Sequence, residues 1–121
     1  LAIALRRQND RTGAKQAITQ GLRIGTERLP LSSMRFELPA MALLCLDAGN
    51  VSRAVELYAA AHQSAYLSHS VWFEAVAGQE IAQAAANLPA DKAEAATARG
   101  QSRDLLATAK ALLTELVADR Y

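Results

Sequence analysis

Few side chains in this chain could do covalent or metal chemistry, and the most reactive types are Cys45, His62 and His69. A zinc site needs several His, Cys or carboxylate ligands at fixed spacing, and no His-Glu-x-x-His sequence occurs. Cys45 and His62 could form a nucleophile and its base. Cys45, however, lies in the apolar run 41–46, where a buried thiol is inert. We therefore expect neither a metal site nor cysteine catalysis.

Two further kinds of catalytic signature are missing from the sequence. No Gly-x-x-x-x-Gly-Lys-Ser/Thr loop is present to bind phosphates. Glu74 and Glu80 are six positions apart, so they do not share a helix face as a paired acid and base would need. We predict that the chain is not an enzyme and uses no cofactor.

The composition indicates an all-α domain. The chain has 121 residues, which is one domain by length, with 51% hydrophobic but only 5% aromatic residues. Alanine, the best helix former, occurs 27 times. Alternating Val/Ile/Thr runs and Asn-Gly or Asp-Gly hairpin turns are missing, so strand signals are poor.

A weak internal repeat of about 40 residues organises the helices. The segment 9–21 aligns with 49–61, and a fainter third copy follows. Small, large and small residues recur in turn at the aligned positions: Ala14, Ile18 and Gly21; Ala54, Tyr58 and Ala61; Ala93, Thr97 and Gly100. Self-similarity at this period is typical of stacked helical solenoids, which bind other proteins more often than they catalyse.

The local signals divide the chain into helical hairpins. We predict an incomplete first hairpin at 1–28, a second at 31–65, a third at 70–99 and a capping helix at 102–119. Gly49 should end one helix in the left-handed conformation and Asn50 should cap the next. Pro39 is expected to bend the helix that contains it, Gly100 to break its helix or mark a bend, and Ser102 to cap the last helix. The predicted fold is a right-handed α-solenoid of antiparallel hairpins with a C-terminal capping helix.

The second hairpin resembles a tetratricopeptide repeat. The positions that carry the resemblance are Leu38, Met41, Ala42, Gly49, Ala54, Tyr58 and Ala61. The period is longer than the 34 residues of that family, Leu38 replaces its tryptophan, and Tyr66 stands where a proline is usual.

The long spacing is similar to the C-terminal arrays of large bacterial regulators of the LuxR or maltose-activator type, which carry a STAND-class NTPase. The stretches 43–58, 70–78 and 98–105 resemble the extreme C-terminus of such arrays. The chain begins as if inside a helix, so we expect a C-terminal fragment of a longer protein. The resemblance implies a non-catalytic protein-interaction or ligand-sensing role in signal transduction or transcription regulation.

Two aromatic-containing clusters are the candidate partner-binding residues. Trp72 and Phe73 could anchor an interface, because exposed aromatic side chains commonly do. The alternative, which we favour for Trp72, is that it fills the groove between helix pairs. Arg35 and Glu37 flank Phe36 on a helix that should line the concave face, where they could contact a partner or be solvated. Tyr58 is expected to be structural, since it repeats Ile18.

Charge and hydropathy define the expected partners and location. Residues 1–28 carry six basic and two acidic residues, a net +4, although the whole chain is only +1. Contact with nucleic acid through this basic end is the weakest of our hypotheses. We favour a protein or peptide partner, other domains of the same chain, or a small-molecule inducer. A stand-alone adaptor, or a scaffold that dimerises through an uncovered N-terminal end, is the alternative.

The single cysteine and the lack of a long apolar segment favour the cytoplasm without membrane contact.

Overall fold

All regular secondary structure in the described part of the chain is helical, as predicted. The computed structural model describes residues 2–27, 37–63, 72 and 74–118. The helices in order are α1 (Ala2–Arg7), α2 (Arg11–Glu27), α3 (Glu37–Asp47), α4 (Val51–Ala61), the π-helical turn η2 (Glu74–Gly78), α7 (Gln79–Ala85), α8 (Ala90–Gln101) and α9 (Leu105–Val117). The predicted all-α class is therefore confirmed. That the helices form a right-handed solenoid of antiparallel hairpins stays a prediction.

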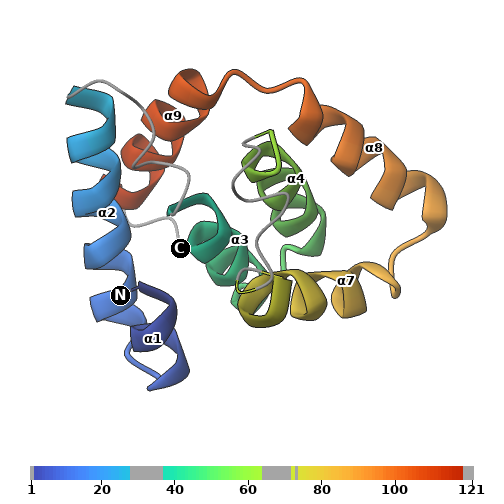
Figure 1. Ribbon diagram of the computed structural model, residues 1–121, viewed down its shortest axis with the longest axis horizontal. Coiled ribbons are helices and arrows are strands. Elements are labelled where there is room, and N and C mark those ends of the chain that lie inside the picture. Colours follow the sequence, from blue (N-terminus) through green and yellow to red (C-terminus); the bar gives the residue numbers. More distant parts are fainter. Residues whose placement is uncertain (1, 28–36, 64–71, 73, 119–121) are drawn as a thin grey trace.

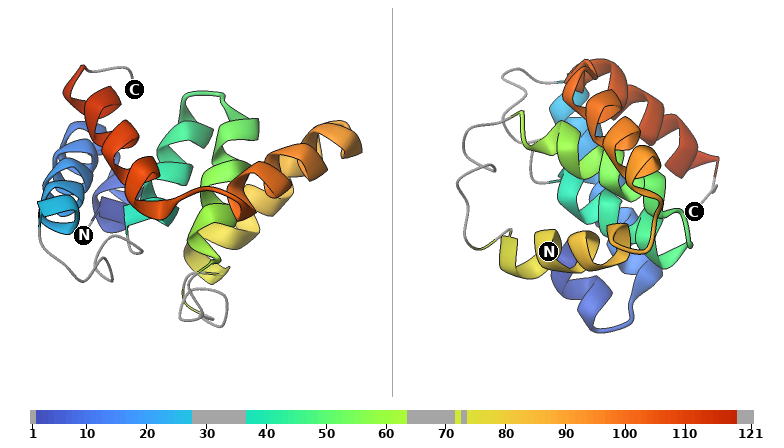
Figure 2. Two further views of the ribbon diagram at one scale, coloured as in Figure 1. Left: turned by 90° about the horizontal axis from the view of Figure 1, so that it is seen from above. Right: turned by 90° about the vertical axis from the view of Figure 1, so that its right-hand side faces the viewer.

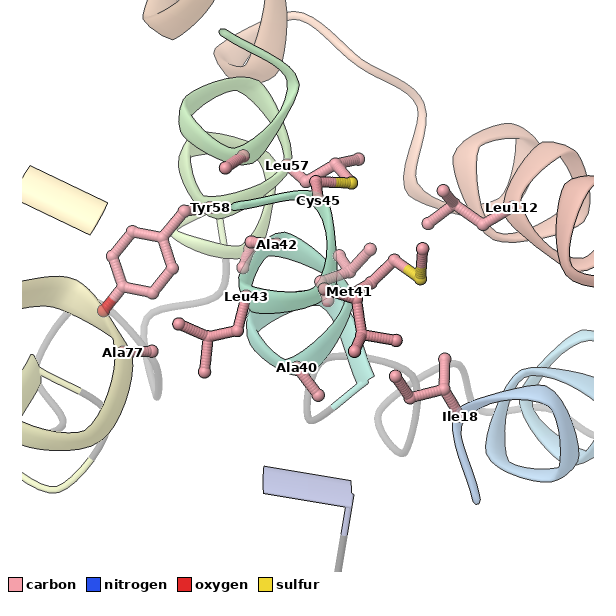
Figure 3. Packing of buried hydrophobic residues seen from close by; sticks show 14 of the residues in the cluster. Ile18, Ala40, Met41, Ala42, Leu43, Cys45, Leu57, Tyr58, Ala77 and Leu112 are labelled. Atoms are coloured by element: carbon pink, nitrogen blue, oxygen red, sulfur yellow. The ribbon is translucent and has the colours of Figure 1, made fainter. Parts of the chain in front are cut away.

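Helix α3 is the centre of the molecule, with other helices on several sides (Figure 1). Every residue from Leu38 to Cys45 is buried, and a helix that is apolar all round must be covered all round. Met41 points toward Ile18 of α2 and Leu112 of α9, whereas Leu43 points toward Ala77 of η2 (Figure 3). The core therefore joins the two ends of the chain through α3.

Pro39 does not interrupt the described part of α3. The helix spans Glu37–Asp47, so Pro39 lies in its first turn, where its missing N–H leaves the helical ladder intact. The predicted bend at an interior proline is therefore not a feature of this helix. The expected caps at Ser32 and Ser33 lie outside the described residues.

The turns before α2 and α4 repeat each other, which gives the sequence repeat a structural basis. Asn9 and Gly49 both have positive φ, of 61° and 84°. After them, Asp10 Oδ1 accepts a hydrogen bond from Gly13 N at 2.8 Å, and Asn50 Oδ1 accepts one from Arg53 N at 3.2 Å. The predicted roles of Gly49 and Asn50 are confirmed.

Backbone hydrogen bonds in the two turns also match pair by pair. The amides of Asp10 and Asn50 donate to the carbonyls of Leu5 and Cys45, both at 2.9 Å, in the pattern of a Schellman motif. In the third copy Pro89 stands at this position, and its nitrogen has no hydrogen to donate. The third turn consequently departs from the other two.

Helices α7 and α8 both pack on α4 rather than closing a hairpin on each other. Figure 1 shows them diverging from the α3–α4 pair. Helix α8 runs along α4 in close contact, and Gly100 makes this possible: a Cβ at Gly100 would meet Glu56 O and Ala59 Cβ. Of the two predicted alternatives for Gly100, a break was wrong because α8 continues through it to Gln101; the turn that ends the helix follows at Ser102.

A buried carboxylate fixes the end of α8 to α4. Glu56 is 7% exposed, and its carboxylate accepts hydrogen bonds from Arg99 Nε at 2.6 Å and from Arg103 Nη2 at 2.6 Å. Burial alone would raise the pKa of Glu56, but the hydrogen bonds and charges of the two arginines hold it below its usual value. Gln63 Nε2 adds bonds to the carbonyls of Gly100 and Arg103, each at 2.9 Å.

The last helix lies at an unexpected place. Helix α9 packs on α2 of the first hairpin, not on the third (Figures 1 and 2). It starts with Asp104 as N-cap, whose side chain accepts from Leu106 N, while Ser102 ends α8. The predicted C-terminal helix exists, but the prediction that Ser102 caps it was wrong.

Candidate interaction surfaces

A groove of about 770 Å³ runs along α2 beside α9. The residues that line it are Thr12, Lys15, Gln16, Thr19, Gln20, Arg23 and Leu116. Those from α2 recur at every third or fourth position, so they form one stripe of the helix. The opposite side of α2 carries Ala14, Ile18 and Leu22, all buried in the core. The amphipathic pattern of α2 therefore produces both the core contact and the groove.

The lining is polar and its only charges are positive. Lys15 and Arg23 are the ionic side chains among the described lining residues, and Lys15 takes part in a further interaction of its own. Gln16, Gln20 and Arg23 are exposed, whereas Lys15 and Thr19 are half-buried. Thr19 Oγ1 donates to Lys15 O at 2.8 Å, which uses its proton and leaves the oxygen able to act only as an acceptor. The groove is thus suited to a ligand that has carboxylates and peptide groups.

Sequence reasoning noticed the basic residues of this groove but not the groove. The N-terminal charge excess was interpreted as a possible nucleic-acid surface. The second wall comes from Leu116, which reaches α2 only because α9 folds back on it. The signal that was available is the polar stripe of α2 itself, with its period of three or four residues.

Arg6 does not contribute to an exposed basic surface. Its guanidinium pairs with Asp47 at 2.7 Å and with Glu80 at 2.9 Å, joining α1 to α3 and α7. The hydrogen bonds that Arg6 donates to Asp47 and then to Glu80 raise its pKa further. Ala2 and Ile3 beside it are buried, so these residues do not form the uncovered apolar end expected to promote dimers.

Three of the five predicted binding residues lie outside the described residues. Arg35, Phe36 and Phe73 are those three. Trp72 is described and is 58% exposed, so the favoured interpretation that it fills a groove between helices was wrong. Glu37 is described and half-buried at the start of α3. Whether any of the five binds a partner stays a prediction.

Substitution of Trp72 should cost little stability. Because 58% of the residue is exposed, Trp72→Ala should change the free energy of unfolding by less than about 1 kcal/mol. Trp72 is the only tryptophan, so its fluorescence reports on this position alone. Acrylamide should quench the native emission almost as strongly as that of the unfolded chain, and a strongly protected native emission would contradict the exposure.

Glu37 is a carboxylic acid held against a helix backbone. Its carboxylate lies over Gly21 of α2, at the place where a Cβ of residue 21 would stand. Burial raises the pKa of Glu37 from 4.5 to about 7. The positive charge of the amino terminus acts in the opposite direction and is the smaller effect. Helix α3 thus meets α2 at Gly21 through an acidic side chain.

The raised pKa of Glu37 should make stability depend on pH. The folded state binds the Glu37 proton more tightly than the unfolded state does. The contribution of Glu37 to the stability of the fold is therefore greatest below pH 4.5 and is lost as the pH rises to about 7. The loss is at most about 3 kcal/mol. Glu37→Gln should therefore be more stable than the natural chain at pH 8 and similar to it at pH 5. Urea unfolding at both pH values measures this, with the exposed Glu94→Gln as control; equal effects of the two variants would contradict it.

A second, smaller groove of about 260 Å³ lies where α7 and α8 diverge on α4. Its lining is mostly apolar and comprises Val55, Tyr58, Ala59, His62, Gly78, Ile81, Ala82, Ala85 and Thr97. Tyr58 is 9% exposed and contacts His62 edge to face, with ring centroids 4.4 Å apart. Tyr58 is therefore part of the core, as predicted, although its edge is accessible from this groove.

Reactive side chains in the described residues are not grouped into a metal site. Cys45 is fully buried in α3, as predicted. Within 2–27, 37–63, 72 and 74–118, no three His, Cys, Asp or Glu side chains are grouped to hold a metal ion. None of the helices in these ranges is long and apolar enough to cross a membrane.

Comparison with known proteins assigns no family to the chain. Neither the models of known protein families, nor the curated proteins, nor the solved structures include a match to the chain. The functional argument therefore depends on the surfaces described above.

Proposed function

We propose that the chain is a non-catalytic interaction module that binds a protein or peptide partner on its helical surface. The observation that supports this most directly is the 770 Å³ groove on α2, an open, polar surface supported by a well-packed core. The repeated turns before α2 and α4 add to it, since stacked helical hairpins present extended surfaces of this kind.

The proposed setting is a multidomain bacterial regulator. The basis is the resemblance of the hairpins and of the C-terminal stretches to the arrays of STAND-class regulators. In that setting, binding at the array favours one arrangement of the domains, and the difference in affinity between arrangements sets the size of the response. Signal transduction, transcription control and a cytoplasmic location are parts of this proposal.

The binding function is tested by selection from a library of displayed random peptides on the immobilised chain. We expect enrichment of peptides that bind reversibly and are recovered uncleaved. The control is the chain denatured in urea and immobilised in the same way, which should enrich none of them. Failure to enrich any peptide on the native chain would contradict the proposal.

The setting is tested by the coding sequence upstream of the Leu1 codon. An upstream P-loop NTPase with a DNA-binding or effector segment supports the regulator. A start codon within one or two further repeats of about 40 residues would instead identify a stand-alone adaptor.

A further inference from the structure

We propose that a pocket at the junction of α1, α2 and α3 binds the phosphate group of a phosphorylated serine or threonine in a partner protein. The inference rests on the proposed binding function and adds to it a second site with a stated partner chemistry. It is carried by two arginines that share the pocket, by the charges beside them and by the place of the pocket on α2.

The pocket has a volume of about 390 Å³ and a cationic lining. The residues that line it are Arg6, Arg7, Asn9, Arg11 and Asp47, with a net charge of +2. Arg7 and Arg11 are exposed, and among the described residues neither side chain has an ion pair or a hydrogen bond. The pocket therefore offers two guanidinium groups to a ligand.

The carboxylates that reach this junction are held by Arg6. Its Nε and Nη2 atoms donate to the two oxygens of Asp47, each at 2.7 Å. Its Nη1 and Nη2 atoms donate to the two oxygens of Glu80, at 3.1 and 2.9 Å. This network joins α1 to α3 and α7, so it fixes one wall of the pocket and keeps both carboxylates away from the other two arginines.

The position of Arg11 is explained better by a bound anion than by the stability of the chain. Arg11 is the first residue of α2, where the positive end of the helix dipole disfavours a cation. The acidic residue before it, Asp10, caps the helix by accepting from Gly13 N at 2.8 Å and does not line the pocket. An anion in the pocket would be attracted by Arg11, by the helix end and by Arg7, which comes from the last turn of α1.

A phosphate monoester suits two guanidinium groups better than a carboxylate does. At pH 7 it carries nearly two negative charges and has three acceptor oxygens. Each guanidinium is a planar fork of donors that can bind two oxygens at once. Asn9, between the two arginines in the sequence, adds an amide donor to the lining. A carboxylate has one charge and two oxygens, which a single arginine already satisfies.

The neighbouring groove points to a peptide as the carrier of the phosphate. Thr12, the residue after Arg11, lines the 770 Å³ groove on α2, so a peptide in that groove lies beside the start of the same helix. The pocket lining has no aromatic residue. Single-stranded nucleic acids are instead bound by tracks of cations and stacked aromatic rings. The lining therefore favours a phosphorylated peptide over a nucleic acid.

The test is a fluorescence anisotropy titration of the chain into a dye-labelled nonapeptide of glycine, alanine and serine with one central phosphoserine. Comparison probes are the unphosphorylated peptide, the peptide with a central glutamate, and a single-stranded oligonucleotide of nine nucleotides. We expect the phosphopeptide to bind about tenfold more tightly than either comparison peptide. Its affinity should rise from about pH 5 to pH 7, as the phosphate loses its second proton, and should fall with added salt.

The source of the phosphate is tested by competition. Unlabelled phosphoserine and inorganic phosphate should displace the labelled phosphopeptide only at concentrations about tenfold higher than the unlabelled phosphopeptide requires, because they lack the peptide's contacts with α2. Equal displacement by the free compounds would overturn the assignment to a peptide partner.

Substitutions locate the binding. Arg7→Gln and Arg11→Gln should each weaken the phosphopeptide about tenfold and leave the unphosphorylated peptide unchanged. Arg11→Lys should recover only part of the affinity, because it keeps the charge and loses the planar fork. Lys92→Gln, an exposed cation of α8, is the control and should change nothing. Without ligand, Arg11→Gln should melt no lower than the natural chain, since it removes a cation from the positive end of α2.

The outcomes separate this inference from the binding function on which it rests. If library-selected peptides bind but phosphorylation gives no advantage, or if the advantage survives Arg7→Gln and Arg11→Gln, the phosphate site is overturned and the binding function stands. If the oligonucleotide binds more tightly than the phosphopeptide, the partner class is overturned. If neither selected peptides nor the phosphopeptide bind up to about 1 mM, both proposals fall.

Discussion

Gly100→Ala should destabilise the protein by about 2 kcal/mol, although alanine is the better helix former. Gly100 lies inside α8, where alanine alone would gain about 1 kcal/mol. The new Cβ would, however, overlap Glu56 O and Ala59 Cβ, and it would also contact Ala60 N of α4. Two of these atoms belong to the backbone of a buried helix, so α8 must move away, and overpacking of this kind costs more than the propensity gain. The expected decrease in the melting temperature is roughly 8 °C.

Gly21→Ala is the matched control, because Gly21 occupies the same repeat position on α2. There the new Cβ would meet only the far end of the Glu37 side chain, which can rotate away. We expect a change within about 1 kcal/mol, with the propensity gain opposing the displaced carboxylate. Equal destabilisation by the two substitutions would show that Gly100 is not needed for the close contact of α8 with α4.

Removing both arginines that hold Glu56 should be the most damaging polar change. Arg99→Ala with Arg103→Ala leaves a 7% exposed carboxylate without the two cations that stabilise its charge. A buried charge that loses its partners typically costs about 3–5 kcal/mol, and we expect the lower part of this range because Arg99 is half exposed. Urea unfolding at pH 7 measures the loss.

Two further measurements identify the orphaned carboxylate as the cause. In the natural chain the pKa of Glu56 is lower in the folded than in the unfolded state, so the ionised carboxylate stabilises the fold at pH values above the unfolded-state pKa. This contribution to stability is lost as the pH falls. In the double variant the contribution of Glu56 should reverse in sign, so that acidification toward pH 5 recovers more stability than in the natural chain, where the raised pKa of Glu37 already gives a gain. Adding Glu56→Gln to the double variant should also recover part of the loss at pH 7. If the effects of the substitutions on the free energy of unfolding simply add, and neither acidification nor Glu56→Gln restores stability, the arginines act through their own packing.

The local features of the fold could be predicted because short segments determine them. Gly49 and Asn50 define a left-handed helix end and an N-cap whatever lies around them, and the structure has both. The same pattern at Asn9 and Asp10 is why the repeat was visible in the sequence. Burial of Cys45 and Tyr58 followed from their places in apolar stripes.

The arrangement of the helices could not be predicted, since it depends on contacts between distant segments. Glycine at position 100 is compatible with a helix break and with a close approach, and only the presence of α4 beside it decides. Arg103, directly before the N-cap of α9, pairs with Glu56, which lies 47 positions earlier in the sequence. Because α9 supplies the second wall of the groove, the candidate binding site was also hidden from sequence reasoning.

The exposure of apolar residues was misjudged for the same reason. Trp72 was expected to fill a groove between helix pairs, yet it is 58% exposed. Ile24 and Val117 are also large apolar residues of helices and are 46% and 63% exposed. Helical periodicity assigns a residue to a face of its own helix but does not say where the neighbouring helix ends.

The central claim is that this helical module recognises peptides through the outer face of α2. Chemical-shift mapping of the isotope-labelled chain, titrated with the tightest library-selected peptide, tests it most directly. The claim predicts that the largest amide shifts fall between Thr12 and Arg23 and around Leu116, and that Arg23→Gln abolishes them at the same peptide concentration. Shifts concentrated instead around Tyr58, Ile81 and Thr97, in the smaller groove, would contradict the claim and place the binding site between α4, α7 and α8.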